Sequence, residues 1–120
     1  MPLVSKILIA FVAVMHIYIL WLEMFGWMTR AKKVFRKFPP ELFAATKPMA
    51  ANQGLYNGFL AAGLLWSLII TNPDWSINVA TFFLNCVAIA GIYGAATIQK
   101  SILYVQTVPA IGALLSVYIL

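Results

Sequence analysis

Apolar residues dominate four long stretches of the chain, which are separated by shorter polar connections. The first stretch contains roughly 25 residues, enough for a helix to cross about 30 Å of hydrocarbon. The second stretch begins at Pro48, and this fits a helix because proline is tolerated in the first helical turn. Pro109 interrupts the fourth and predicts a kink. We expect an all-α integral membrane protein, a single domain over residues 1–120 with four transmembrane helices at about 3–27, 48–70, 75–98 and 101–120.

Composition and charge placement support this interpretation. Of the 120 residues, 63% are hydrophobic and only 9% are charged, whereas about 25% charged residues is usual for soluble domains. The basic residues gather on one side of the predicted membrane, with six in the 28–47 connection and Lys100 between the last two helices, against Lys6 on the other side. The positive-inside rule therefore makes both connections cytoplasmic and puts both termini and the Asn72 turn on the outer side.

The basic connection also has a helical pattern of its own. Its apolar residues recur at i, i+3, i+4 and i+7, namely Ala31, Val34, Phe35 and Phe38. This pattern predicts a short amphipathic helix on the membrane surface, between the first two spans, with its cations near anionic lipids. The expected lipid-facing cations are Arg30, Lys32, Lys33, Arg36 and Lys37. A solvated basic loop is the alternative, and nothing in the pattern favours nucleic acid as a partner.

Two ionisable residues lie inside the first apolar stretch. His16 and Glu23 are seven positions apart, so they share one helical face at a separation of about 10 Å along the axis. A carboxyl group removed from water without a nearby cation favours its neutral form, and we expect Glu23 to act as a general acid or base assisted by His16 or Tyr93. Alternatively, Glu23 reaches the interface or pairs with Arg30 or Lys33, and His16 is a neutral imidazole bonded to an amide or carbonyl.

Polar side chains from the other three helices fall at similar depths. The predicted topology places Gln53, Asn57, Tyr93 and Gln106 near Glu23, and groups His16 with Asn85 nearer the midplane. We therefore expect a pocket in the cytoplasmic half that holds a small or lipid-like molecule. Its predicted ligand-binding residues are Asn52, Gln53, Tyr56, Asn57, Asn85 and Gln106. The alternative is that these groups only join helices by hydrogen bonds. We expect no metal and no cofactor, because the His, Cys and carboxylate residues do not form a ligand set.

Family resemblance is carried by three stretches: HIYILWLEMFGW, AATKPMAANQGLYNGFLAAGLLW and FFLNCVAIAGIYGAATIQKSILYVQTVPA. In these the chain resembles the small bacterial membrane family known as domain of unknown function thirteen-oh-four. The resemblance implies a four-helix protein of the bacterial inner membrane with no assigned activity. The resemblance also implies that some members carry the label epimerase, but no motif in this chain supports that label.

Three functions fit the sequence. The first is a membrane-embedded pocket that binds a small or lipid-like molecule. If Glu23 also performs acid–base chemistry there, the protein is an enzyme such as an intramembrane isomerase or epimerase, and the sequence leaves this open. The second is a small proton-coupled transporter, which would act as a parallel homo-oligomer because the charge bias fixes one orientation. The third is a structural or accessory membrane subunit without a ligand.

Overall fold

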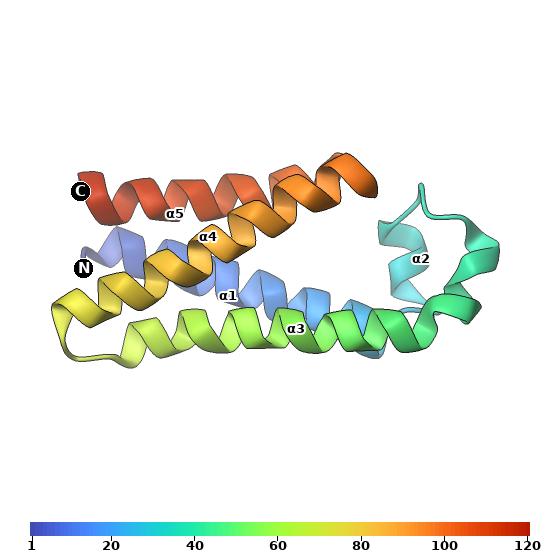
Figure 1. Ribbon diagram of the computed structural model, residues 1–120, viewed down its shortest axis with the longest axis horizontal. Coiled ribbons are helices and arrows are strands. Elements are labelled where there is room, and N and C mark those ends of the chain that lie inside the picture. The colour runs from blue at the N-terminus through green and yellow to red at the C-terminus, as the bar shows by residue number, and fades with distance from the viewer.

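The computed structural model describes all residues 1–120 and consists of helices without strands, so the predicted all-α fold is confirmed. Figure 1 shows long helices running along a molecule of 48 × 23 × 17 Å, with both termini and the α3–α4 turn at one end and α2 at the other. The long elements are α1 (Leu3–Met24), α3 (Phe43–Ile69), α4 (Pro73–Thr97) and α5 (Val108–Ile119). The short elements are α2 (Arg30–Val34), the 3₁₀ turn η1 (Pro40–Leu42) and the π-helical turn η2 (Leu103–Thr107), which continues into α5.

Two of these helices, α1 and α4, are long and apolar enough to cross a membrane. The apolar stretch formed by η2 and α5 is shorter, and α3 is long enough but does not pass the same test. Asn52, Gln53 and Asn57 reduce the hydropathy of α3. Length and composition therefore identify two candidate spans rather than the four that we expected.

The core is a thin layer of small and branched side chains between the long helices. Its centre includes Val12 and Ala13 of α1, Leu84 of α4 and Ala110 of α5, each 0–1% exposed. Alanines at the contacts let the helix backbones approach closely. Only 30 of the 120 residues are buried, so most large apolar side chains face outward.

An aromatic cluster closes the end of the bundle at the basic connection. The Trp27 ring lies 4.9 Å from that of Phe43, 5.8 Å from Phe35 and 5.6 Å from Phe38, measured between ring centroids. The predicted amphipathic helix is wrong in extent, because α2 ends at Val34 and the chain then folds back. Phe35 and Phe38 cover Trp27 instead of facing lipid, since the indole offers them a large apolar surface.

The same tryptophan explains why α3 starts before Pro48. Its indole N–H donates to the carbonyl of Phe43 at 3.0 Å and to the hydroxyl of Thr46 at 3.1 Å, and the Phe43 side chain is buried. These contacts fix the first turn of α3, so Pro48 lies inside the helix rather than at its start. Because Pro48 has no N–H, the backbone carbonyl of Ala44, four residues earlier, receives no helical hydrogen bond from it. Ala44 is exposed, so this carbonyl is not buried without a partner.

The regular helical hydrogen bonding of the last long segment is interrupted just before Pro109, in the π-helical turn η2. Proline has no N–H for the carbonyl of Val105, and the bonding ladder shifts so that Val108 N–H donates to Leu103. The wider turn lets two consecutive residues, Gln106 and Thr107, both point inward. Thr107 donates to the Ala88 carbonyl of α4 at 2.9 Å, and Gln106 faces α1.

Close packing of α4 against η2 at Gly91 gives a first prediction. A Cβ at Gly91 would lie 2.8 Å from the backbone nitrogen of Thr107 and 2.9 Å from the Gln106 Cβ, whereas a Cβ at Gly112 would meet nothing within 4 Å. We expect Gly91→Ala to lower the free energy of unfolding by about 1–3 kcal/mol through overpacking, measured by thermal circular dichroism. The control Gly112→Ala should leave stability unchanged or raise it. Equal stability of both variants would contradict the observed α4–η2 contact.

Candidate functional site

A carboxyl–amide pair joins α1 to α3 near the basic end. The two helices approach closely at Gly54, where a Cβ would lie 2.7 Å from Met24 Cγ and 3.0 Å from Glu23 Cβ. One turn further on, Asn57 donates its side-chain N–H to Glu23 Oε1 at 2.5 Å and also reaches the Gln53 carbonyl at 3.3 Å. Because Gly54 has no side chain, α1 and α3 come close enough for Asn57 to donate to the Glu23 carboxyl.

Glu23 retains free bonding capacity. Its side chain is half-buried, and Asn57 contacts only one of the two carboxyl oxygens. Neither predicted alternative partner holds it: Arg30 donates to the Tyr18 hydroxyl at 3.4 Å, and Lys33 is exposed. The second carboxyl oxygen can therefore accept a hydrogen bond from a ligand or carry a proton.

His16 forms a separate, sealed pair with Gln106. The side chain of His16 is 0% exposed, and its Nδ1 lies 2.8 Å from the Val12 carbonyl. Because a carbonyl only accepts, Nδ1 carries the hydrogen, which leaves Nε2 to accept from the Gln106 amide at 3.0 Å. This is the neutral-imidazole alternative drawn from the sequence. Both ring nitrogens are occupied, so His16 has no free atom to assist Glu23.

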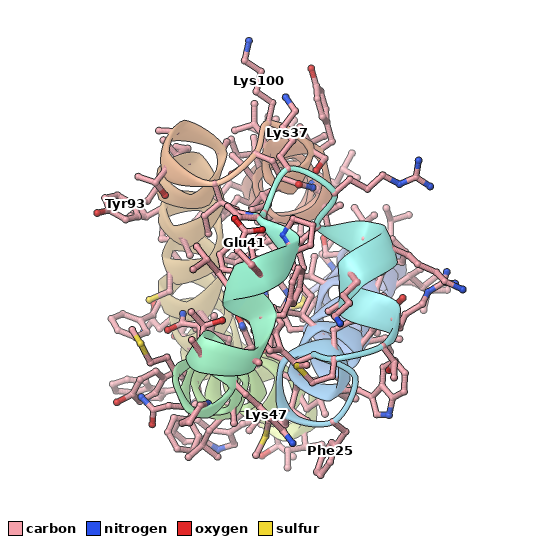
Figure 2. All side chains as sticks on the ribbon, turned by 90° about the vertical axis from the view of Figure 1, so that its right-hand side faces the viewer. Phe25, Lys37, Glu41, Lys47, Tyr93 and Lys100 are labelled. Atoms are coloured by element: carbon pink, nitrogen blue, oxygen red, sulfur yellow. The ribbon has the colours of Figure 1, made fainter.

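The other predicted site residues, the catalytic candidate Tyr93 included, all lie on the surface. Asn85 does not pair with His16. Its side chain is exposed on α4, and its amide donates to the backbone carbonyl of Thr81 in the same helix at 2.8 Å. Tyr93 is 72% exposed and points away from the bundle, as Figure 2 shows. The remaining exposed members of the predicted layer are Asn52, Gln53 and Tyr56.

The predicted four-helix polar layer is therefore split rather than joined. In Figure 1, α4 follows α3 only near their connecting turn and then crosses towards α5, so the facing flanks of α3 and α4 separate at the basic end. Two open grooves lie at the opposite end of the molecule. One of them, of about 510 Å³, is lined by Trp66, Trp75 and residues of the α3–α4 turn.

Hydroxyl groups provide interhelical bonds that the sequence interpretation missed. Ser5 of α1 and Ser116 of α5 are buried and 2.9 Å apart, and Ser76 of α4 donates to the Ser67 carbonyl of α3 at 2.7 Å. A signal for Ser5 was available, since it precedes His16 by eleven positions and so lies on the same helical face. No group of His, Cys, Asp or Glu is placed to hold a metal ion.

Cations cover the end of the molecule beyond the aromatic cluster. Arg30, Lys32, Lys33, Arg36 and Lys37 are all exposed. Figure 2 looks onto this end, where Lys37, Lys47 and Lys100 extend outward around Glu41. The Lys32 ammonium also lies 5.9 Å from the centre of the Phe43 ring, which is a cation–π contact between the basic segment and the first residue of α3.

Comparison with known proteins confirms the resemblance found in the sequence. The sequence model of a family described as protein of unknown function (DUF1304) matches residues 10–118. The chain is also similar to the uncharacterized protein YpaA of Lactococcus lactis, with 29% identity over 118 residues, covering 97% of this chain and 98% of YpaA. No solved structure matches the chain. The family match includes both interior pairs, Glu23 with Asn57 and His16 with Gln106.

A double-mutant cycle tests the α1–α3 pair. We expect Glu23→Ala and Asn57→Ala to be coupled by about 0.6–2 kcal/mol in the free energy of unfolding, because each removes the other's partner. The control cycle combines Glu23→Ala with Asn52→Ala, since Asn52 is exposed on the same helix and should show no coupling. A coupling between Glu23 and Asn57 no larger than the control value would show that the pair does not form.

Proposed function

The chain belongs to the DUF1304 family of proteins of unknown function, and from this premise we propose a function on its own geometry. We propose that it is an integral membrane protein whose Glu23–Asn57 pair binds a small or lipid-like molecule and exchanges a proton with it. The observation that carries the proposal is the half-buried Glu23 carboxyl, with one oxygen held by Asn57 and the other available.

Exposure of apolar side chains supports the membrane placement. Only 28% of the most apolar part of α1 and 33% of that of α4 is buried, whereas the core helix of a soluble protein is mostly buried. Large side chains such as Ile7, Phe11 and Val14 of α1 are at least half exposed. A bilayer covers such surfaces, because its acyl chains are as apolar as the side chains themselves.

Charge placement supports one orientation in a bacterial inner membrane. The exposed cations at the α2 end, together with Lys100, favour the cytoplasmic side and its anionic lipids. Both termini and the α3–α4 turn lie at the opposite end, as Figure 1 shows, and would face the outer side. The four long helical segments would then cross the bilayer, with α3 carrying its amides at Asn52, Gln53 and Asn57 in the cytoplasmic half.

The chemistry proposed for Glu23 follows from its surroundings. A carboxylate in an apolar setting can accept a proton from a hydroxyl or ammonium group of a bound molecule and return it, which is general acid–base behaviour. Asn57 positions the carboxyl through one oxygen and leaves the reactive oxygen free. Proton-coupled transport would use the same group.

A structural subunit without a ligand is the second candidate. It is favoured by the complete pairing of the interior, since no buried side-chain nitrogen or oxygen lacks a hydrogen-bond partner. In that case Glu23 and Asn57 would serve only to join α1 to α3.

Cysteine labelling tests the orientation. In a Cys86→Ser background, we expect Thr71→Cys in the α3–α4 turn to react with a membrane-impermeant maleimide in intact cells. Lys100→Cys should react only after the membrane is permeabilised, because it lies at the basic end. The opposite pattern would overturn the orientation, and equal labelling of both before permeabilisation would overturn the membrane crossing.

Native mass spectrometry of the purified protein tests the site. We expect a co-purifying small molecule or lipid whose occupancy falls several-fold in Glu23→Gln, a change that retains side-chain size but removes the carboxyl. Glu41→Gln is the matched control, since Glu41 is exposed outside the long helices, and it should keep wild-type occupancy. Identical spectra for all three proteins would favour the structural candidate.

A further inference from the structure

One flank of α3 exposes polar side chains without giving them partners. Asn52, Gln53 and Tyr56, here called the amide flank, are all exposed, and Tyr56 is 51% exposed. The side-chain amides of Asn52 and Gln53 make no hydrogen bond within the chain; the one side-chain hydrogen bond that reaches Gln53 is donated by the Asn57 amide to the Gln53 backbone carbonyl. These groups are thus open to a partner from outside the molecule.

The position of the amide flank makes this exposure costly if the protein crosses the membrane as proposed above. Asn52 precedes Ile69, the last residue of α3, by 17 residues, which is about 25 Å at 1.5 Å per residue. With Ile69 at the outer boundary of a hydrocarbon core about 30 Å thick, the whole flank lies inside that core. Acyl chains cannot bond to an amide, so a side-chain amide left facing them is strongly disfavoured.

We propose that two copies of the chain associate in parallel through the amide flank. The charge bias gives every copy the same orientation, so a two-fold axis along the membrane normal relates the two copies. Such an axis brings residues of equal depth together, and the flank would meet itself. A primary amide carries both donors and an acceptor, and it is therefore complementary to a second copy of itself.

The small residues of α3 support hydrogen bonding, rather than glycine packing, as the basis of this contact. Gly54 and Gly58 are spaced as in a helix-dimer motif, but both are already occupied within the chain. A Cβ at Gly54 would meet Met24, and one at Gly58 would lie 2.6 Å from Leu20. Neither glycine is free for a partner, which leaves the amides as the specific groups on the open side.

Association through this flank also affects the proposed site. Gln53 is the residue whose carbonyl accepts from Asn57, so the flank adjoins the Glu23–Asn57 pair. A second copy seated there would cover the neighbouring side of the pair and keep lipid from it. This consequence rests on the function proposed above, whereas the dimer itself rests only on the membrane placement.

Disulfide cross-linking in native membranes tests the contact directly. In a Cys86→Ser background, we expect at least one of Asn52→Cys, Gln53→Cys and Tyr56→Cys to form several-fold more cross-linked dimer than Leu55→Cys. Leu55 is exposed at the same depth of α3, about 100° around the helix from Tyr56 and about 160° from Gln53, and is the matched control. No excess over Leu55→Cys at any of the three positions would overturn the proposal.

Single-molecule photobleaching in dilute liposomes supplies the second measurement. We expect two-step bleaching for the wild type and mainly one-step bleaching for the double variant Asn52→Leu with Gln53→Leu, which removes both amides from an exposed surface. Asn85→Leu should remain dimeric, because that exposed amide bonds to its own helix. A monomeric wild type, or a double variant that still dimerises, would overturn the proposed contact.

Alkaline carbonate extraction separates failure of the dimer from failure of the membrane placement. Wild-type protein that stays in the membrane but is monomeric refutes the dimer alone. Protein released by carbonate refutes both the dimer and the membrane function. Cross-linking of the flank to a different membrane protein in place of a second copy would also overturn the proposal.

Discussion

Polar groups on one face of an apolar helix impose the main constraint on this structure. Ser5, His16 and Glu23 all lie on the inward face of α1, and each is paired with a different residue: Ser116, Gln106 and Asn57, respectively. Two of these partners belong to the η2–α5 segment and one to α3. The three bonds therefore fix how both neighbouring helices are positioned along α1, each contributing about 0.6–2 kcal/mol if the setting is a bilayer.

Close packing and hydrogen bonding depend on each other at these contacts. Gly54 lets α1 and α3 approach until Glu23 and Asn57 can bond, and Gly91 gives Thr107 room beside α4. The π-helical turn caused by Pro109 then directs Gln106 and Thr107 to two different helices. A side chain at either glycine would weaken helix packing and separate the bonded groups. Substitution of a packing glycine would therefore also disturb the hydrogen-bonded residues beside it.

Sequence patterns predicted which residues face inward on α1 but not where the other helices would turn. The spacing of His16 and Glu23 fixes a shared face because it depends on a single helix. The layer prediction for Tyr93 and Asn85 depended on depth alone, and depth does not give the rotation of α4 or its divergence from α3. The aromatic cluster around Trp27 was missed for a similar reason. Its contacts with Phe35, Phe38 and Phe43 join residues 8 to 16 positions apart, and local periodicity does not show such contacts.

Glu23 is where this architecture and the proposed chemistry meet. It is held to α3 by the same kind of bond that joins the other helices, yet one of its oxygens remains available. Solid-state NMR of the protein in phospholipid bilayers measures this arrangement most directly. We predict a through-space correlation between the Asn57 side-chain nitrogen and the Glu23 carboxyl carbon, together with lipid acyl contacts along the outer face of α1. A Glu23 carboxyl in contact with bulk water and without that correlation would contradict the account.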